Sequence, residues 1–236
     1  LTFSGDSVSS ANYTFNGASP LNFTDAIKFN VVNATVNVNS DVTLEAGMTL
    51  SSEGTDDVPS AALNFGGDTT FSGDLNFDVE NRGVITFDTV TMSGGTIEAT
   101  GNASEDDPSS IRFNGAVDNT AGGPTTFDTT GNVIWTFADA YTFGGLQTFI
   151  GEQAPEAAEG EDQENWVSTY VFEDDGVGFT FDNTNKFTVD IATLQIDRDA
   201  AVEAGTQLNV TGEGRYIFNG EVTSQQNAEY IAGAGS

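Results

Sequence analysis

A segment of 27 residues, from Lys28 to Gly54, recurs without a gap from Lys186 to Gly212. Eleven positions are identical between the two copies, and they include the only two lysines of the chain. A looser copy, V-T-M-S-G-G-T-I-E-A-T-G, covers residues 90–101. An internal repeat means that one supersecondary unit recurs along the chain and is stacked on its neighbours. It indicates a structural or surface protein more than an enzyme, which needs its active site only once.

The repeated units carry the signals of β-strands. Thr, Val, Phe and Asn fill runs in which apolar and polar residues alternate, and Gly, Asp and Ser separate these runs. Convincing helical periodicity is absent from the sequence. The alternating runs are Phe29–Val38, Gly83–Met92, Ile111–Val117, Lys186–Ile196 and Tyr216–Val222.

The phenylalanines follow a spacing of their own. Three of them stand six residues apart in N-F-G-G-D-T-T-F-S-G-D-L-N-F (64–77), and three more in T-F-A-D-A-Y-T-F-G-G-L-Q-T-F (136–149). An even spacing places all three rings on one face of an extended chain. We therefore expect most of the 18 phenylalanines to form an aromatic core rather than a platform for a ligand.

These patterns predict an all-β fold, a β-solenoid of the parallel β-helix type with internal repeats. Two β-sandwich units are the alternative, because the clear copies lie 158 residues apart whereas the looser copy follows the first after about 48. We expect a single elongated repetitive domain over residues 1–236, with repeat copies at about 13–67, 84–117 and 170–222. The acidic run at 151–165 is expected to form an exposed loop.

Runs such as L-T-F-S-G-D (1–6) and V-T-L-E-A-G-M-T-L-S (42–51) share their composition and cadence with a known group of proteins. They resemble the repeats of autotransporter-like passenger domains and other extracellular β-helix surface proteins. The resemblance covers about half of the chain and includes no invariant motif. It implies an extracellular β-helical stalk or surface layer.

The composition limits the possible partners and chemistry. With 36 acidic and 6 basic residues the formal charge is −30, which repels nucleic acids and anionic membrane surfaces. The absence of Cys and His excludes disulfides, thiolate metal sites and the commonest general base. No apolar run approaches the ~20 residues of a membrane span. The chain begins at Leu1 without an initiator methionine, as expected after removal of a signal peptide or in an excerpt of a longer protein.

Calcium is the cofactor whose oxygen ligands this composition supplies best. The candidate ligands lie in short acidic runs that match neither the EF-hand pattern nor the nonapeptide repeat of secreted β-rolls. Solvated acidic loops are the alternative interpretation of the same runs. The candidates are Asp56, Asp57, Asp106, Asp107, Asp174 and Asp175.

Lys28 and Lys186 occupy the same position of the repeat, each beside a phenylalanine. One hypothesis is an intramolecular isopeptide bond to an asparagine or aspartate, which requires a buried lysine with a lowered pKa. The other is a salt bridge at a repeat boundary, to Asp41 and Asp199 or their neighbours.

We therefore expect a non-catalytic extracellular or cell-surface protein, a subunit of a filament, sheath or surface layer. Copies would form a homopolymer through β-strand edges or strand donation. The alternative is an adhesin or carbohydrate-binding stalk that binds glycans through Trp135, Trp166, Tyr141 or Tyr170. A polysaccharide-active β-helix enzyme is the third hypothesis, since a glycosidase needs only two carboxylates. No acidic pair stands out as catalytic, however, and the basic residues are scattered.

Overall fold

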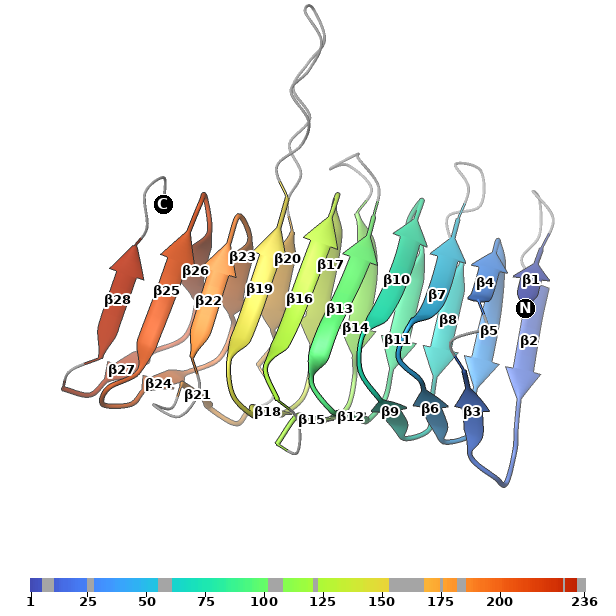
Figure 1. Cartoon of the computed structure of the whole chain (residues 1–236), viewed down its shortest axis with the longest axis horizontal. Coiled ribbons are helices and arrows are strands. Elements are labelled where there is room, and N and C mark those ends of the chain that lie inside the picture. The colour runs from blue at the N-terminus through green and yellow to red at the C-terminus, as the bar shows by residue number, and fades with distance from the viewer. Residues whose placement is uncertain are drawn as a thin grey trace, which may run out of the picture.

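The computed structural model describes residues 1–5, 11–24, 28–54, 61–101, 108–120, 123–152, 168–174, 176–181, 186–226 and 228–232. Within these ranges there is no helix, and therefore none that could span a membrane. Short strands pair in parallel with the strands of the turns before and after them, so that the chain coils into a β-solenoid (Figure 1). This confirms the predicted solenoid. The alternative of two β-sandwiches is wrong, since sandwiches consist of antiparallel sheets.

Each turn of the solenoid contributes one strand to each of three sides. Sheet A forms the first side and consists of β1 (Thr2–Ser4), β4 (Lys28–Val32), β7 (Met48–Glu53), β10 (Leu75–Glu80), β13 (Gly95–Thr100), β16 (Thr125–Thr130), β19 (Gln147–Gly151), β22 (Phe187–Asp190), β25 (Gln207–Thr211) and β28 (Glu229–Ala232). Sheet B forms the second and consists of β2 (Ala11–Phe15), β5 (Ala34–Val38), β8 (Ala62–Phe65), β11 (Val84–Phe87), β14 (Ser109–Phe113), β17 (Val133–Phe137), β20 (Thr169–Phe172), β23 (Thr193–Ile196) and β26 (Arg215–Phe218).

The third side is divided between two sheets. Sheet C consists of β3 (Leu21–Phe23), β6 (Val42–Leu44), β9 (Thr69–Phe71), β12 (Val90–Met92), β15 (Val117–Asp118) and β18 (Tyr141–Thr142). Sheet D continues the same side with β21 (Phe179–Phe181), β24 (Ala200–Val202) and β27 (Val222–Ser224).

The length of a turn depends on the corner between sheets A and B. Where that corner is tight, paired residues of sheet A lie 21 or 22 positions apart, as do Phe29 and Leu50 (21) and Thr125 and Gln147 (22). Where residues 153–167 intervene, the separation rises to 40, from Gln147 to Phe187. Additional residues at this corner, 6–10, 55–60, 102–107 and 153–167, occur in every second turn from the first to the seventh. This alternation explains why the sequence repeat has no regular period.

Tight corners also divide strands that the sequence predicts as continuous. The run Phe29–Val38 is broken at Asn33, whose φ of 49° turns the chain from β4 into β5. The run Lys186–Ile196 is broken at Ile191, with a φ of 51°, between β22 and β23. These two residues are equivalent in the sequence repeat, and a left-handed backbone is unusual for the β-branched one. Both copies of the repeat therefore form the same corner, although the residue at the corner differs between them.

A stacked column of rings runs through the interior behind sheet B. It contains Phe65, Phe87, Phe113, Phe137 and Phe172, each at most 1% exposed. Successive ring centroids lie 5.0, 5.4, 4.9 and 4.6 Å apart, with interplanar angles of 5 to 17°. A parallel in-register ladder repeats each side chain at about the strand spacing of 4.8 Å, which is also a favourable distance for offset stacking. The predicted aromatic core is confirmed.

The spacing of six residues has a different origin from the one expected. Phe65, Phe71 and Phe77 belong to three different sides, on β8, β9 and β10, and do not lie on one face of a single strand. All three are buried, and the rings of Phe71 and Phe77 are 6.1 Å apart. A spacing of six residues therefore connects one inward-facing position with the next inward-facing position around the corner.

Candidate functional site

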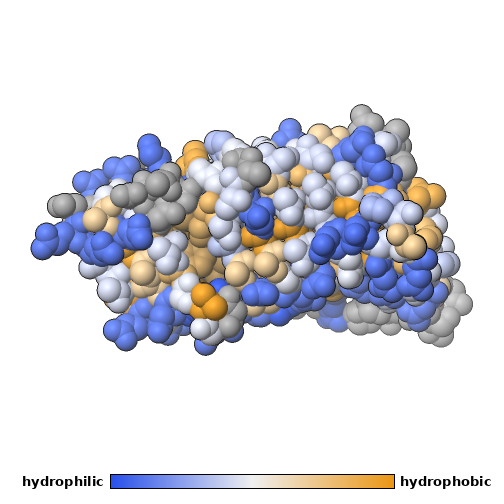
Figure 2. Space-filling model, turned by 90° about the horizontal axis from the view of Figure 1, so that it is seen from below, coloured by the Kyte–Doolittle hydropathy of each residue, from blue (hydrophilic) through white to orange (hydrophobic). Residues whose placement is uncertain are grey.

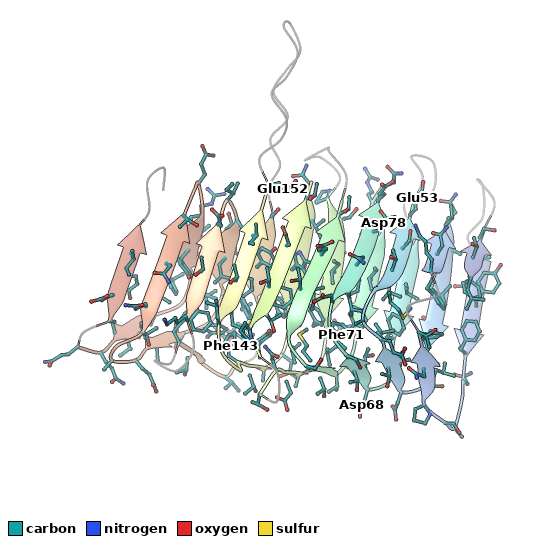
Figure 3. All side chains as sticks on the ribbon, in the orientation of Figure 1. Glu53, Asp68, Phe71, Asp78, Phe143 and Glu152 are labelled. Carbon is teal, nitrogen blue, oxygen red and sulfur yellow. The ribbon has the colours of Figure 1, made fainter. Side chains whose placement is uncertain are left out.

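The outer face of sheet A carries two groups of carboxylates, Glu53, Asp78 and Glu80, and farther along Glu98, Asp128 and Glu152 (Figure 3). Glu53 pairs with Glu80 across β7 and β10, and Glu98 pairs with Asp128 across β13 and β16. Like charges directly opposite each other destabilise a sheet. This face is therefore acidic and under local electrostatic repulsion.

Partial burial and the repulsion together raise the pKa of one carboxyl in each group. Partial burial raises the pKa of Glu80, and the charges of Asp78 and Glu53 raise it further, whereas Lys28 lowers it. Partial burial likewise raises the pKa of Asp128, with added effects of Glu152 and Glu98. A carboxyl whose pKa is higher in the folded state destabilises the fold when it is ionised. That cost disappears as the pH falls through the folded and then the unfolded pKa.

The substitution Glu80→Gln is expected to stabilise the protein at neutral pH. The gain should be about 1 kcal/mol or less, because the site is largely solvated. It should vanish in acid, where the wild-type carboxyl is already protonated. Chemical denaturation at neutral and acid pH measures both values. The exposed Glu213→Gln makes the same change in net charge and is the control. An equal gain in the control would show that only the net charge matters.

One ion pair joins β14 to the corner that follows β20. The Arg112 guanidinium donates to both carboxylate oxygens of Glu173, with N···O distances of 3.0 and 2.6 Å. These hydrogen bonds lower the pKa of Glu173. A depressed pKa stabilises the fold above the unfolded value, and this contribution is lost as the pH falls through the folded value. Both side chains are more than a third exposed, so the contribution is small.

The third side of the solenoid has a groove where sheets C and D meet. β18 and β21 belong to successive turns, yet they belong to separate sheets. The corner from Phe172 to Phe179 is three residues longer than the corresponding corner from Phe137 to Tyr141, which separates the two strands. Figure 2 shows this side of the molecule, where apolar surface is visible between hydrophilic residues.

The groove holds a cavity of about 260 Å³. Its lining combines aromatic rings, threonine hydroxyls and Arg198, which is only 4% exposed. A second cavity of about 270 Å³ borders the other side of β21. Most of the residues that line the first cavity are Tyr141, Thr142, Phe143, Val177, Phe179, Thr180 and Arg198. This arrangement can accommodate a small ligand that offers both an apolar surface and hydrogen-bonding groups.

The expectation that Trp135 and Tyr170 contact glycans is wrong, because both side chains belong to the core. Trp135 and Tyr170 have no exposed surface. The Trp135 indole N–H donates to Thr129 Oγ1 at 2.9 Å, and the Tyr170 hydroxyl lies 2.8 Å from the same oxygen. Tyr141 is 9% exposed and borders the groove, whereas Trp166 lies outside the described residues. Buried Trp and Tyr need such polar partners, which explains the threonine between them.

Of the six calcium candidates only Asp174 lies within the described residues, whereas Asp56, Asp57, Asp106, Asp107 and Asp175 lie outside them. Asp174 Oδ1 accepts the backbone N–H of Gly176 at 2.9 Å, a local turn interaction. Within the described part of the chain, no three Asp, Glu, His or Cys side chains are grouped to hold a metal ion. Calcium binding remains a prediction.

The two lysines lie on the surface. Lys28 Nζ is 3.5 Å from Asp78 Oδ2, and the lysine side chain is 58% exposed. The prediction that Lys28 pairs with Asp41 is wrong, because Lys28 pairs with Asp78. Asp41 Oδ1 instead accepts a hydrogen bond from the backbone N–H of Asp68. Lys28 reaches Asp78 because β4 and β10 both flank β7. Lys186 is also exposed, so neither lysine has the burial that the isopeptide chemistry requires.

Sequence reasoning missed the carboxylate pairs and the groove. The pairs Glu53–Glu80 and Glu98–Asp128 are 27 and 30 positions apart, and these separations include additional corner residues of different lengths. The acidic loop predicted at 151–165 falls outside the described residues from 153 on. These positions could have been aligned by searching the sequence for a repeat of about 22 residues, with insertions allowed at one corner of each turn.

Comparison of the chain with protein-family models, with curated proteins and with solved structures found no match.

Proposed function

We propose that the protein is a non-catalytic extracellular structural subunit that builds a filament, sheath or surface layer from many copies. The copies would join end to end, with the strand edges of one solenoid pairing with those of the next. The observation that carries this proposal is the character of the N-terminal turn. The stacked aromatic column supports it, because it packs five successive turns of the solenoid against one another.

The first described turn of the solenoid has strand edges with no charged side chains in the residues that the structure describes. β1, β2 and β3 are the terminal strands of sheets A, B and C. The described residues of this turn, 1–5 and 11–24, include no Asp, Glu, Lys or Arg, in a chain with 36 acidic residues. Phe15 is 38% exposed there, and Phe3 and Tyr13 are only half-buried. Soluble proteins normally protect such edges with charges, prolines or bulges. The described edges of β1 and β2 have no charged side chain and no proline, which makes them suited to pairing, whereas Pro20 precedes β3.

The opposite end has a different surface. Among the described strands, the last ones are β28, β26 and β27, and sheet A extends one strand beyond sheet B. Val222, Tyr230 and Ile231 are 39, 57 and 44% exposed, next to acidic residues such as Glu229. Because the two ends differ, their contact would be heterologous, and head-to-tail contacts that do not close form open filaments. The charge of −30 opposes association, so salt should promote it.

The substitution Phe15→Lys is expected to prevent end-to-end assembly, because it places a charge on an edge whose described side chains are uncharged. Sedimentation velocity and electron microscopy from low to high salt, with and without calcium, measure assembly. The wild type should form larger species and filaments as salt increases, whereas the variant should stay small. Thr100→Lys, at an exposed site of sheet A, makes the same charge change and should assemble normally. Monodisperse wild-type monomers in every buffer would contradict the proposal.

A second candidate function is glycan binding by an adhesin-like stalk, and the groove between sheets C and D favours it. Phe143 and Phe179 offer apolar rings beside the hydroxyls of Thr142 and Thr180. Sugars bind to such combinations of ring surface and hydrogen-bonding groups. A glycan array with the purified protein tests this candidate, and uniform lack of binding would exclude it for the glycans displayed.

A further inference from the structure

The outer faces of the two long sheets differ sharply in charge. The outward positions of sheet B form two columns that cross all nine strands, one from Asn12 to Arg215 and one from Thr14 to Ile217. No Asp or Glu occurs in either column of these described strands. The outer face of sheet A, in contrast, has the carboxylate groups around Glu80 and Asp128. In a chain of charge −30, the strands of sheet B thus present a face without negative side chains, whereas the residues that follow these strands include Asp88, Glu173 and Asp197 at the border of the face.

The polar side chains of this face interact within it. Asn64 Nδ2 donates to Asn37 Oδ1 at 3.0 Å, and Arg215 Nε donates to Thr193 Oγ1 at 2.7 Å. Arg112 is held in its ion pair with Glu173 at the border of the face. The remaining outward residues are small, polar or aliphatic, and most are half-buried. The face is therefore ordered before any partner binds, which limits the entropy lost on association.

We propose that sheet B is a lateral self-association surface, on which two copies of this chain pack face to face about a two-fold axis. Two molecules of charge −30 repel each other, and they can approach most closely where the facing strands carry no carboxylates. Val84, Ile134 and Val171 provide aliphatic contact on this face. Paired β-sheets pack with their strands nearly aligned, and two such sheets can interdigitate these side chains.

The dimensions of sheet B fit a small specific interface. Nine strands at about 4.8 Å and about 14 Å of strand length give a face of roughly 40 by 14 Å. Two such faces would bury on the order of 1,100 Å² in total, at the lower limit for specific association. The outward columns contain no aromatic residue among the described strands, which makes stacking of sugar rings a poor fit. This contact is lateral and does not depend on the end-to-end pairing proposed above.

The test uses the Phe15→Lys background, in which end-to-end pairing is blocked. In high salt, sedimentation equilibrium should give twice the 24.7 kDa of one chain. Thr86→Glu and Val171→Glu, on β11 and β20, should each weaken dimerisation at least tenfold, because they bury a charge between the two faces. Thr126→Glu, on the outer face of sheet A, adds the same charge and should change the dissociation constant less than twofold. Circular dichroism verifies that each variant is folded.

A monomer in the Phe15→Lys background at every concentration would overturn the lateral contact. If the wild type still formed filaments, the end-to-end proposal would stand alone. Equal weakening by Thr126→Glu and Thr86→Glu would also overturn the assignment to sheet B, because it would show a general effect of charge. Conversely, a dimer that persists while no filament forms in any buffer would support the lateral contact and contradict the proposed polymer.

Discussion

Replacing Phe113 with alanine is expected to lower the free energy of unfolding by about 3–5 kcal/mol, the range for truncating a buried phenylalanine. The ring is fully buried in the middle of the stacked column. Its centroid lies 5.4 Å from that of Phe87, 4.9 Å from that of Phe137 and 6.4 Å from that of Trp135. The backbone ladders fix the distance between turns, so the neighbouring turns cannot collapse into the space that the ring leaves.

Phe15→Ala is the matched control for this substitution. Phe15 lies in the same strand position of sheet B, but in the terminal turn, and it is 38% exposed. Its truncation should cost no more than about 1.5 kcal/mol, since much of the ring already contacts water. Urea denaturation of both variants, under conditions in which the protein is monomeric, measures the difference. Similar losses in the two variants would mean that the aromatic column is not the main source of stability.

The position of Phe113 along the rod adds a second effect. In a solenoid each turn contacts only the turns before and after it, so stability is close to a sum of turn and interface terms. A weak central turn divides the rod into two shorter segments, each with fewer interfaces. We therefore expect the Phe113→Ala variant to unfold over a broader range of urea than the wild type.

The aromatic core could be predicted from the sequence because it depends on a local pattern. Phenylalanines six residues apart are close enough in sequence for the pattern to be recognised. In the structure, the three members of each triplet follow one another around the sides of the solenoid. The expectation that they share one face of a strand failed at the corners. A residue such as Asn33 turns the chain with one left-handed φ, and the buried apolar positions change there from odd numbers, ending at Val31, to even numbers, beginning at Ala34.

The surfaces could not be predicted because they depend on register between turns. Glu53 and Glu80 are neighbours only after residues 55–60 are set aside, and Glu98 and Asp128 only after 102–107. The lack of acidic residues on sheet B is equally hidden, because its outward positions are scattered through the sequence at unequal intervals. Parallel pairing over one turn converts these distant positions into columns.

Gly83→Ala is expected to destabilise the protein by about 3 kcal/mol, at the upper end of the usual cost of overpacking. A Cβ at this position would lie 1.9 Å from the carbonyl oxygen of Ser52 and 2.9 Å from that of Glu80. Both obstacles are backbone atoms, so no side-chain rotation can relieve the overlap. The chain approaches this closely because Asn81 and Arg82, with φ of 49 and 60°, make the tight corner between β10 and β11.

Relief of the overlap would require the corner to move away from the preceding turn. Such a movement would strain the hydrogen bond from the Val84 N–H to the Ala61 carbonyl, 3.0 Å long, which begins the pairing of β11 with β8. Gly123→Ala is the control, because no atom lies within 4 Å of its Cβ position, and it should change stability by less than about 0.5 kcal/mol. Thermal and urea unfolding of the two variants compare them directly. If Gly83→Ala were as stable as Gly123→Ala, the close contact of successive corners, and with it the register of this turn, would be wrong.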